Sequence, residues 1–249
     1  MDKTRHKRYK SKNKSAYKTL KCSPSSNSVD KNTCYSSKSL HKLKEHWNAR
    51  HPDKLIATND PREIWNSLKM YMGDVCNTEQ CWLNQKFIKG NLNKELLNYT
   101  FAPTAPDTWK LNPNEWLNSL DILHVMKQYE KAYSKFVFIG PTPIDFDKKK
   151  LYGECVWEEL CNFSLDKMLQ RGKTKIGIIF NLDPHYKPGS HWVALYIDLN
   201  KKYMFHFDSN GDKIHRNIKN LVKRIKGQGE QLSAPINLRY DDNYKFEHQ

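Results

Sequence analysis

Residues 189–211 read Gly-Ser-His-Trp-Val-Ala-Leu-Tyr-Ile-Asp-Leu-Asn-Lys-Lys-Tyr-Met-Phe-His-Phe-Asp-Ser-Asn-Gly. Two runs rich in aromatic and β-branched residues flank a polar turn at residues 198–201, which is the pattern of a β-hairpin. A two-residue turn at Leu199-Asn200, or a four-residue turn at 198–201, places His191 directly opposite Asp208. The stretch therefore predicts a hairpin whose open end carries a histidine and a carboxylate.

The predicted pairing of His191 with Asp208 has a chemical consequence. Side chains that face each other in neighbouring strands have Cβ atoms about 4.5–5.5 Å apart, so an imidazole and a carboxylate can form a hydrogen bond. A carboxylate that accepts from one ring nitrogen orients the imidazole and leaves the other nitrogen to take a proton from a nucleophile. The pair is thus a candidate general base and orienting group. An ion pair without chemistry is the alternative.

Apolar patterns outside the hairpin predict further strands and helices. Residues 176–181 are apolar on both faces, as in a central strand, and residues 134–141 form a short apolar run that stops at Gly140-Pro141. The predicted fold class is α+β, with helices packed on a mixed central sheet. Helical periodicity is found at residues 61–72, 81–88, 156–168 and 214–225.

One further helix is predicted to start at Asn112. Asn112 would be the N-cap, Pro113 would occupy the first helical position, and Glu115 the third. An apolar face then continues as far as Tyr129. We therefore expect a helix of about five turns before the first strand.

Length and composition predict one domain of catalytic size plus an appendage, and the pattern along the chain divides the rest. With 249 residues the chain can bury one sizeable core. Residues 1–40 are rich in Lys, Ser and Asn and poor in large aliphatic residues, so we expect a disordered basic tail. Residues 41–109 are expected to form a helical N-terminal extension, and residues 110–249 a domain of catalytic size.

The positive charge is concentrated at the N-terminus. Residues 1–50 hold 14 Lys/Arg and 3 Asp/Glu, which gives +11 of the formal net charge of +15 and leaves +4 for residues 51–249. The tail is a candidate for weak contact with nucleic acid, and a solvated tail or localisation signal is the alternative. The same two interpretations apply to a cationic helix face formed by Lys213, Arg216, Lys219, Lys223, Arg224 and Lys226.

The six cysteines and the absence of long apolar stretches indicate the setting of the protein. Six are too few for a disulfide scaffold of this length, so reduced thiols are expected. The spacings Cys76-x4-Cys81 and Cys155-x5-Cys161 differ from those of zinc knuckles, so no metal is predicted. No stretch reaches the roughly 18–20 apolar residues of a membrane span, and the N-terminus is too polar for a secretory signal. We therefore expect a soluble protein that is not secreted.

Several blocks together resemble a known family. Ile176-Gly-Ile-Ile-Phe-Asn181, Gly189-Ser-His-Trp192 and Phe207-Asp-Ser-Asn-Gly211 are similar to the His-Trp and Asp-Ser blocks of papain-like cysteine peptidases of the adenovirus-protease and SUMO-protease superfamily. Within it the chain looks closest to thiol proteases of large cytoplasmic DNA viruses. The resemblance covers roughly residues 110–249 and implies a papain-like fold, with hydrolysis of peptide or isopeptide bonds and no metal or organic cofactor.

The resemblance also assigns roles to individual residues. It implies His191 as general base, Asp208 as its orienting partner, and Gln249 as oxyanion donor through its side-chain amide. Trp116, Asp121 and Trp192 match substrate-binding positions of the family. For Trp116 a helix-start residue that packs on the core is the preferred interpretation. A core tryptophan is the alternative for Trp192, and a solvated helix charge is the alternative for Asp121.

The nucleophile of the family has no counterpart in these residues. In relatives the catalytic cysteine follows the oxyanion glutamine, whereas every cysteine here precedes His191. We therefore expect that the chain is truncated before the nucleophile and is inactive alone. An upstream nucleophile at Cys155 or Cys161 is disfavoured against a buried free cysteine.

The resemblance implies a protein substrate, either a viral polyprotein or virion precursor, or a ubiquitin-like conjugate. It places the protein in the virion or the host cytoplasm. The alternative functions are an inactive peptidase-like binding module and a basic virion protein that packages nucleic acid.

Overall fold

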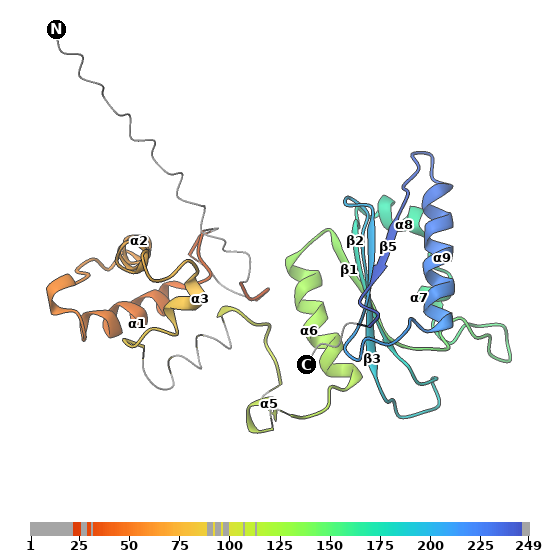
Figure 1. The fold of residues 1–249 in the computed structure, drawn as a ribbon, viewed down its shortest axis with the longest axis horizontal. Coiled ribbons are helices and arrows are strands. Elements are labelled where there is room, and N and C mark those ends of the chain that lie inside the picture. The colour runs from red at the N-terminus through yellow and green to blue at the C-terminus, as the bar shows by residue number, and fades with distance from the viewer. Residues whose placement is uncertain are drawn as a thin grey trace, which may run out of the picture. The chain divides into compact units, whose positions relative to one another are not determined.

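The computed structural model describes residues 22–25, 29–30, 32–88, 92, 96, 100–106, 108–112 and 114–245. The chain divides into two compact units, Met1–Thr104 and Ala105–Gln249, which are described separately below (Figure 1). No helix within the described residues is long and apolar enough to cross a membrane.

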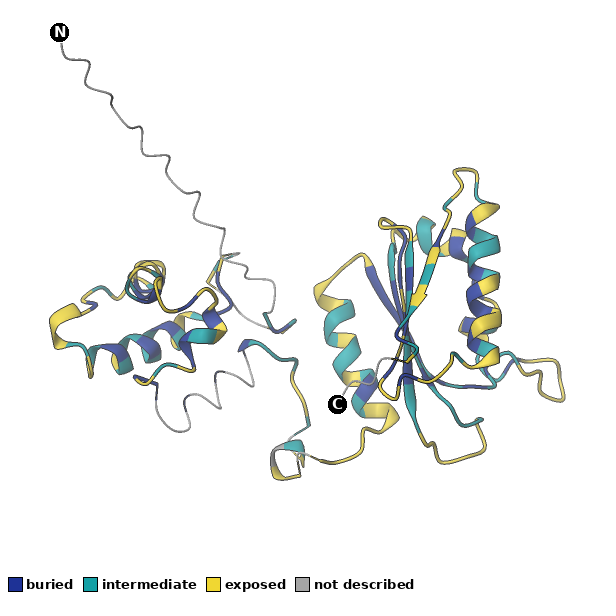
Figure 2. Cartoon of the chain, in the orientation of Figure 1, coloured by how far each residue is buried: buried dark blue, intermediate teal, exposed yellow. Residues whose placement is uncertain are grey.

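The N-terminal unit is built from short helices. These are α1 (Ser37–Asn48), a 3₁₀ turn η1 (Pro52–Lys54), α2 (Pro61–Met72) and α3 (Glu79–Trp82). Asp60 caps α2 by accepting from the N–H groups of Arg62 and Glu63, which explains why the predicted run begins at residue 61. The buried faces of α1 and α2 meet in one core that includes Leu40, Leu43, Ile64, Leu68 and Trp82 (Figure 2).

Ordered structure reaches into the segment predicted as a disordered tail. Ser37 to Leu40 already belong to α1, and Tyr35 is completely buried. The buried carboxylate of Glu79 holds this approach to α1, because Oε2 accepts from the Cys34 N–H (2.8 Å) and Oε1 accepts from Trp65 Nε1 (2.5 Å). Burial raises the pKa of Glu79. The sequence interpretation missed this contact because it joins residues far apart along the chain.

All six cysteines lie among the described residues, and all six form disulfides. The bonds join Cys22 to Cys34, Cys76 to Cys81 and Cys155 to Cys161, with Cα atoms 5.0, 5.5 and 6.2 Å apart. The predictions of reduced thiols and of a buried free cysteine at positions 155 and 161 are therefore wrong. Short chain separations explain the pairing, since each intervening loop returns its two Cα atoms to disulfide distance.

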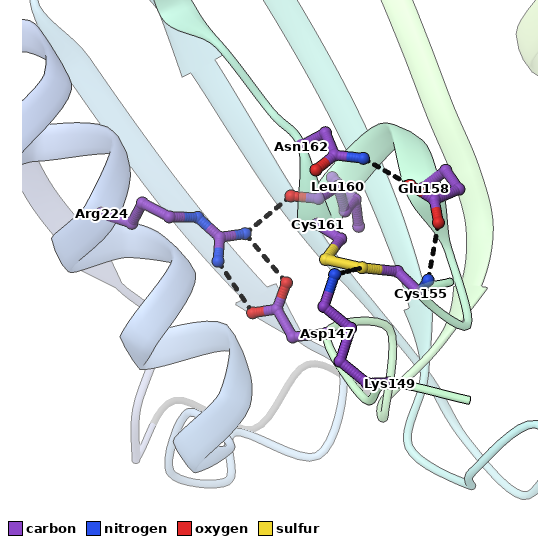
Figure 3. The surroundings of a disulfide bond; sticks show 8 residues. All are labelled: Asp147, Lys149, Cys155, Glu158, Leu160, Cys161, Asn162 and Arg224. Atoms are coloured by element: carbon purple, nitrogen blue, oxygen red, sulfur yellow. Dashed lines mark hydrogen bonds and ion pairs between the residues drawn. A yellow bond between two sulfur atoms is a disulfide. The ribbon is translucent and has the colours of Figure 1, made fainter. Parts of the chain in front are cut away.

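The loop that carries Cys155 and Cys161 is attached to a helix of the C-terminal unit, α9 (Arg216–Glu230). Arg224 of α9 donates two hydrogen bonds to the Asp147 carboxylate (3.0 and 3.1 Å) and one to the Leu160 carbonyl (2.6 Å) (Figure 3). Lys149 Nζ lies 3.0 Å from Cys155 Sγ. Arg224 therefore belongs to an internal contact, so the predicted cationic face of the helix loses one of its members.

The C-terminal unit contains a five-stranded sheet with the strand order β1-β2-β3-β4-β5. β2 pairs antiparallel with β3, and β3 with β4, whereas β1–β2 and β4–β5 are parallel pairs. The prediction of an α+β fold with a mixed central sheet is confirmed. The strands are β1 (Phe136–Pro143), β2 (Lys175–Asn181), β3 (Trp192–Asp198), β4 (Tyr203–Asp208) and β5 (Arg239–Asp242).

Helices lie on both sides of this sheet (Figure 1). On one side α6 (Ser119–Ala132) packs Ile122 against Phe136 and Phe138 of β1. On the other side α9 contributes to the main core, where alternate residues of β3 and β4 are buried. Main-core residues from these elements are Val193, Leu195, Ile197, Met204, Ile218, Leu221, Val222 and Ile225.

Two predicted helix boundaries are wrong. The helix that was expected to start at Asn112 begins only at Ser119, where Asn118 is the N-cap of α6. A separate single turn, α5 (Thr108–Leu111), comes before it. Residues 114–120 are exposed, so a helix there would bury no apolar face. The run predicted as one helix over residues 156–168 consists of α7 (Glu158–Cys161) and α8 (Leu165–Gln170), since Ser164 caps a new helix.

Candidate active site

The β3–β4 hairpin has a register that differs from the predicted one. Asp198 pairs with Tyr203 across a loop at residues 199–202, and Val193, not His191, faces Asp208. The Asp198 carboxylate accepts from the Lys201 N–H and from Lys175, which keeps Asp198 in the ladder. The predicted register is therefore wrong by two residues. Because side chains alternate with a period of two, His191 remains on the same face as Asp208.

His191 and Asp208 form the hydrogen bond that the hairpin predicted. His191 Nε2 lies 2.6 Å from Asp208 Oδ1, and the Asp208 side chain is only 3% exposed. Since an ionised carboxylate can only accept, Nε2 carries the proton of this bond. In the neutral ring Nδ1 then holds a lone pair, and it has no hydrogen-bond partner within the described residues.

The Asp208 carboxylate and its backbone are held by further hydrogen bonds. Oδ1 also accepts from the Asn210 N–H (2.9 Å). The Asn243 side chain accepts from the Asp208 N–H (2.9 Å) and donates to the Asp208 carbonyl (2.6 Å). The Lys245 N–H donates to the Gly211 carbonyl (2.9 Å), so residues 243–245 lie at the same end of the hairpin as Asp208. Gln249 lies outside the described residues, and its predicted role as oxyanion donor stays a prediction.

A second buried histidine lies two residues before Asp208 on β4. His206 pairs with Asp242 of β5, and its Nε2 is buried without a hydrogen-bond partner. Burial lowers the pKa of His206, and the nearby charges of Asp208 and Asp242 oppose this shift only in part. Tyr240 donates to Asp242 (2.9 Å), and burial together with that carboxylate raises the Tyr240 pKa. The strand period alone could have placed His206 on the Asp208 face.

The predicted substrate residues occupy one end of this unit. Trp192 follows His191, and its Nε1 donates to the Leu117 carbonyl (3.0 Å), which ties the segment before α6 to the start of β3. Trp116 in that segment is 80% exposed, so the preferred interpretation of a residue that packs on the core is wrong. Asp121 is the third residue of α6 and accepts from the Asn118 N–H (3.4 Å), so it completes a capping box.

A groove of about 590 Å³ lies between the first half of α6 and the loop that precedes His191. His185 of this loop contacts Asp145 through Nδ1 and Oδ2 (2.7 Å), a second His–Asp pair that the sequence interpretation did not find. The two residues lie 40 positions apart, so no local pattern indicated their contact. Groove residues include Leu120, Leu123, Lys127, Asp183, His185 and Trp192.

Comparison with known proteins confirms the predicted resemblance to thiol peptidases of the SUMO-protease superfamily. Residues 167–237, which include His191 and Asp208, match the Ulp1 protease family, C-terminal catalytic domain (Peptidase C48). A protein of Acanthamoeba polyphaga mimivirus named "Putative thiol protease" is 31% identical over 177 residues. The alignment covers 70% of this chain and 55% of that protein, so the chain spans about half the length of this curated relative.

Solved structures of proteases are also similar to the chain. The crystal structure of an ASFV protease is 16% identical with a TM-score of 0.47, and the match covers 91% of this chain and 79% of that chain. The SUMO protease Ulp1 with its catalytic cysteine oxidised to a sulfinic acid is 22% identical with a TM-score of 0.37. That match covers 55% of this chain and 60% of the Ulp1 chain.

Proposed function

We propose that this chain carries the acid–base part of a cysteine peptidase that cleaves viral polyproteins or virion precursors, or ubiquitin-like conjugates. His191 is the general base, and Asp208 orients it. The observation that carries the proposal is the 2.6 Å contact from Nε2 to a buried carboxylate, which directs Nδ1 away from Asp208. The match of residues 167–237 to the Ulp1 protease family supports it.

The proposed reaction uses Nδ1 of His191 twice. Nδ1 takes the proton of a cysteine thiol, and the sulfur attacks the substrate carbonyl carbon. When the C–N bond breaks, the imidazolium gives this proton to the leaving amine, and a thioester remains. Nδ1 then takes a proton from water, whose oxygen attacks the thioester carbonyl carbon. The C–S bond breaks, the acid product leaves, and the sulfur takes the proton back from Nδ1, which restores the thiol and the neutral imidazole. The side-chain amide of Gln249 is the proposed donor to the oxyanion. These steps require no metal or organic cofactor.

The thiol of this reaction is absent from residues 1–249, all of whose cysteines are in disulfides. A disulfide sulfur has no proton to give to His191 and no thiolate to attack a carbonyl. We therefore propose that the 249-residue chain has no peptidase activity by itself. A serine-protease triad that has lost its nucleophile still accelerates hydrolysis by a factor on the order of 10³–10⁴ over the reaction in water.

The proposed substrate site includes Trp116, Asp121, Trp192 and the adjoining groove. The bond from Trp192 to the Leu117 carbonyl keeps the segment with the exposed Trp116 indole near the residue after His191. An exposed tryptophan offers a large apolar surface to a bound peptide. The carboxylate of Asp121 accepts from the Asn118 N–H in the helix cap, and its remaining lone pairs can accept from a bound peptide.

The decisive experiment compares the 249-residue chain with the same chain continued through any coding sequence that follows residue 249. Candidate polyprotein peptides and ubiquitin-like conjugates are substrates, and an iodoacetamide-type probe labels a reactive thiol. We expect cleavage and labelling only with the continued chain, and loss of cleavage on His191→Gln. His124→Gln, on an exposed position of α6, is the matched control. Iodoacetamide-sensitive cleavage by the short chain that is lost on Cys155→Ala or Cys161→Ala would overturn the assignment.

The disulfide pairing of all six cysteines favours one second candidate, an inactive peptidase-like binding module. Such a module would bind a ubiquitin-like protein or virion precursor without cleaving it. Binding that is lost on Trp116→Ala but kept on His191→Gln, with no cleavage by either form of the chain, supports the module.

We further propose a location in the virion or host cytoplasm. Fractionation of infected cells and purified virions tests this location.

A further inference from the structure

We infer that Asn243 is a positioning residue for the Asp208–His191 pair. Asn243 follows β5 directly, and two hydrogen bonds join its side chain to the backbone of Asp208. The inference rests on the proposed function, because it concerns how the proposed base is held. In this role Asn243 acts through Asp208 and does not itself contact the substrate or the reacting atoms.

The ladder between β4 and β5 explains why a side chain is needed at this point. Paired residues end at His206 and Asp242, and Asp208 lies two positions beyond this last pair. On its other side Asp208 is paired with Val193 of β3. The Asp208 carbonyl also accepts from the Gly211 N–H (3.0 Å), whereas the Asp208 N–H donates to the Asn243 side chain. Asp208 and Asn243 are 2% and 5% exposed, so water does not replace Asn243 at this N–H.

The carboxamide of Asn243 extends the sheet by one pair of hydrogen bonds. Its Oδ1 accepts from the Asp208 N–H at 2.9 Å, and its Nδ2 donates to the Asp208 carbonyl at 2.6 Å. An amide side chain offers the same acceptor and donor as a peptide group, so it can take the place of a neighbouring strand. The last residue of β4 is therefore fixed from both sides.

Fixing this backbone fixes the direction of the carboxylate. The Asp208 side chain is short, so a rotation of its backbone moves Oδ1 away from His191 Nε2 and away from the Asn210 N–H. Catalytic groups need their supporting contacts to hold position within a fraction of an ångström. Loss of the carboxamide should thus weaken the His191–Asp208 bond while the sheet core, which lies further along β3 and β4, stays packed.

Two substitutions of Asn243 remove its hydrogen bonds to Asp208 to different degrees. Asn243→Ala removes both hydrogen bonds. Asn243→Asp keeps an acceptor for the Asp208 N–H, loses the donor to the Asp208 carbonyl and adds a charge near Asp208 and Asp242. Asn200→Ala is the matched control, because Asn200 is an exposed residue in the turn at the opposite end of the same hairpin.

The experiment measures the ring N–H of His191 by ¹H–¹⁵N NMR in the 249-residue chain. We expect a downfield Nε2–H signal in the parent and in Asn200→Ala. In Asn243→Ala its exchange with water should be at least tenfold faster, or the signal should be lost, with an unchanged core spectrum; Asn243→Asp should lie between. Unchanged exchange in a folded Asn243→Ala protein would overturn the inference. If that variant does not fold, an unchanged signal in Asn243→Asp would overturn it.

This readout separates the inference from the proposed function. The NMR signal needs no turnover, so an inactive chain still tests the role of Asn243. In a continued chain with activity, we expect Asn243→Ala to lower kcat with little change in KM, because the substrate groove is not part of the contact. A change of KM alone would contradict the positioning role.

Discussion

Nε2 of His191 lies 2.6 Å from Oδ1 of Asp208, although Val193 is the residue that faces Asp208 across the hairpin. The bond therefore runs along the diagonal of the ladder, where Cα atoms of neighbours are roughly 7–8 Å apart and only longer side chains meet. His191 directly precedes β3, and its carbonyl accepts from the Leu182 N–H (2.9 Å), so it is the imidazole that spans the diagonal to Asp208. A diagonal contact of this kind leaves the Nδ1 edge of the ring at the end of the sheet.

Asp208→Asn is expected to remove the orientation of His191 and leave the hairpin intact. A neutral amide can donate to Nε2, so the ring can place its proton on Nδ1, the atom that must accept from a thiol. In a continued chain with activity, kcat should fall on the order of 10³–10⁴, as for the corresponding change in a serine-protease triad. The measurement is kcat for Asp208→Asn against Asp212→Asn, an exposed aspartate in the next loop. Equal rates would contradict the assignment.

Glu79 should make the stability of the N-terminal unit depend on pH. Burial raises the pKa of its carboxyl above the usual 4.5, although hydrogen bonds from Thr33, Cys34 and Trp65 oppose the rise. The folded unit therefore binds the proton more tightly than the unfolded chain does. The stability from this group is fully present below pH 4.5 and is lost as the pH rises through the raised pKa.

Glu79→Gln is expected to remove this pH dependence and to lower stability at every pH. Both carboxylate oxygens of Glu79 accept a hydrogen bond, from the Cys34 N–H and from Trp65 Nε1. A glutamine side chain has one oxygen and one NH2 group, so it places a donor where one of these oxygens accepts. Urea unfolding below pH 4.5 and near neutrality measures the slope, with the exposed Glu45→Gln as control. A slope that is the same in Glu79→Gln and in the parent would exclude Glu79 as its source.

Arg224→Met should destabilise the C-terminal unit more than a surface charge change does. The guanidinium makes two bonds to Asp147 and one to the Leu160 carbonyl, and both charged side chains are about a third exposed. After allowance for solvent screening we expect a loss of about 1–2 kcal/mol. Thermal or urea unfolding of Arg224→Met is compared with Lys223→Met, the exposed neighbour on α9. The expectation fails if the two variants are equally stable.

Trp192→Phe tests the tether between β3 and the segment before α6. Phenylalanine fills the apolar part of the site but cannot donate to the Leu117 carbonyl. The expected loss of stability is about 0.5–1.5 kcal/mol, the usual contribution of one hydrogen bond. In a continued chain with activity, KM should rise more than kcat falls, because Trp116 loses its position. Tyr196→Phe, further along the same strand, is the control; a purely kcat effect would point to His191 instead.

The hairpin shows how much of the site the sequence predicts. Alternation of apolar residues predicted both strands, and a face shared by His191 and Asp208 follows from the same period. The register was wrong because the loop holds four residues, 199–202, so Asp198 pairs with Tyr203. The Asp198 carboxylate accepts from the Lys201 N–H inside this loop and from Lys175 of another strand, and neither contact can be read from local alternation. An error of two residues preserves the face, which is why the contact was predicted even though the pairing was not.

The features that sequence patterns missed depend on tertiary contacts. Asn112 and Asn118 both offer helix caps, and only the burial of Ile122 after the second one selects it. The disulfides depend on how loops return on themselves. Asn243 has no local signal, because its partner Asp208 lies 35 residues earlier.

The parallel pairing of β4 with β5 determines when the site can be completed during folding. The His191–Asp208 bond closes 17 residues of chain, whereas the bonds of Asn243 close 35 and require α9 to cross over first. Each doubling of a loop costs only about 0.6 kcal/mol more in closure entropy, yet non-local pairing is the slow event in folding. On a ribosome the hairpin also emerges before its anchor. The carboxylate is thus in place early and becomes rigid late, so amide protection during refolding should reach Leu195 and Met204 before it reaches Asp208.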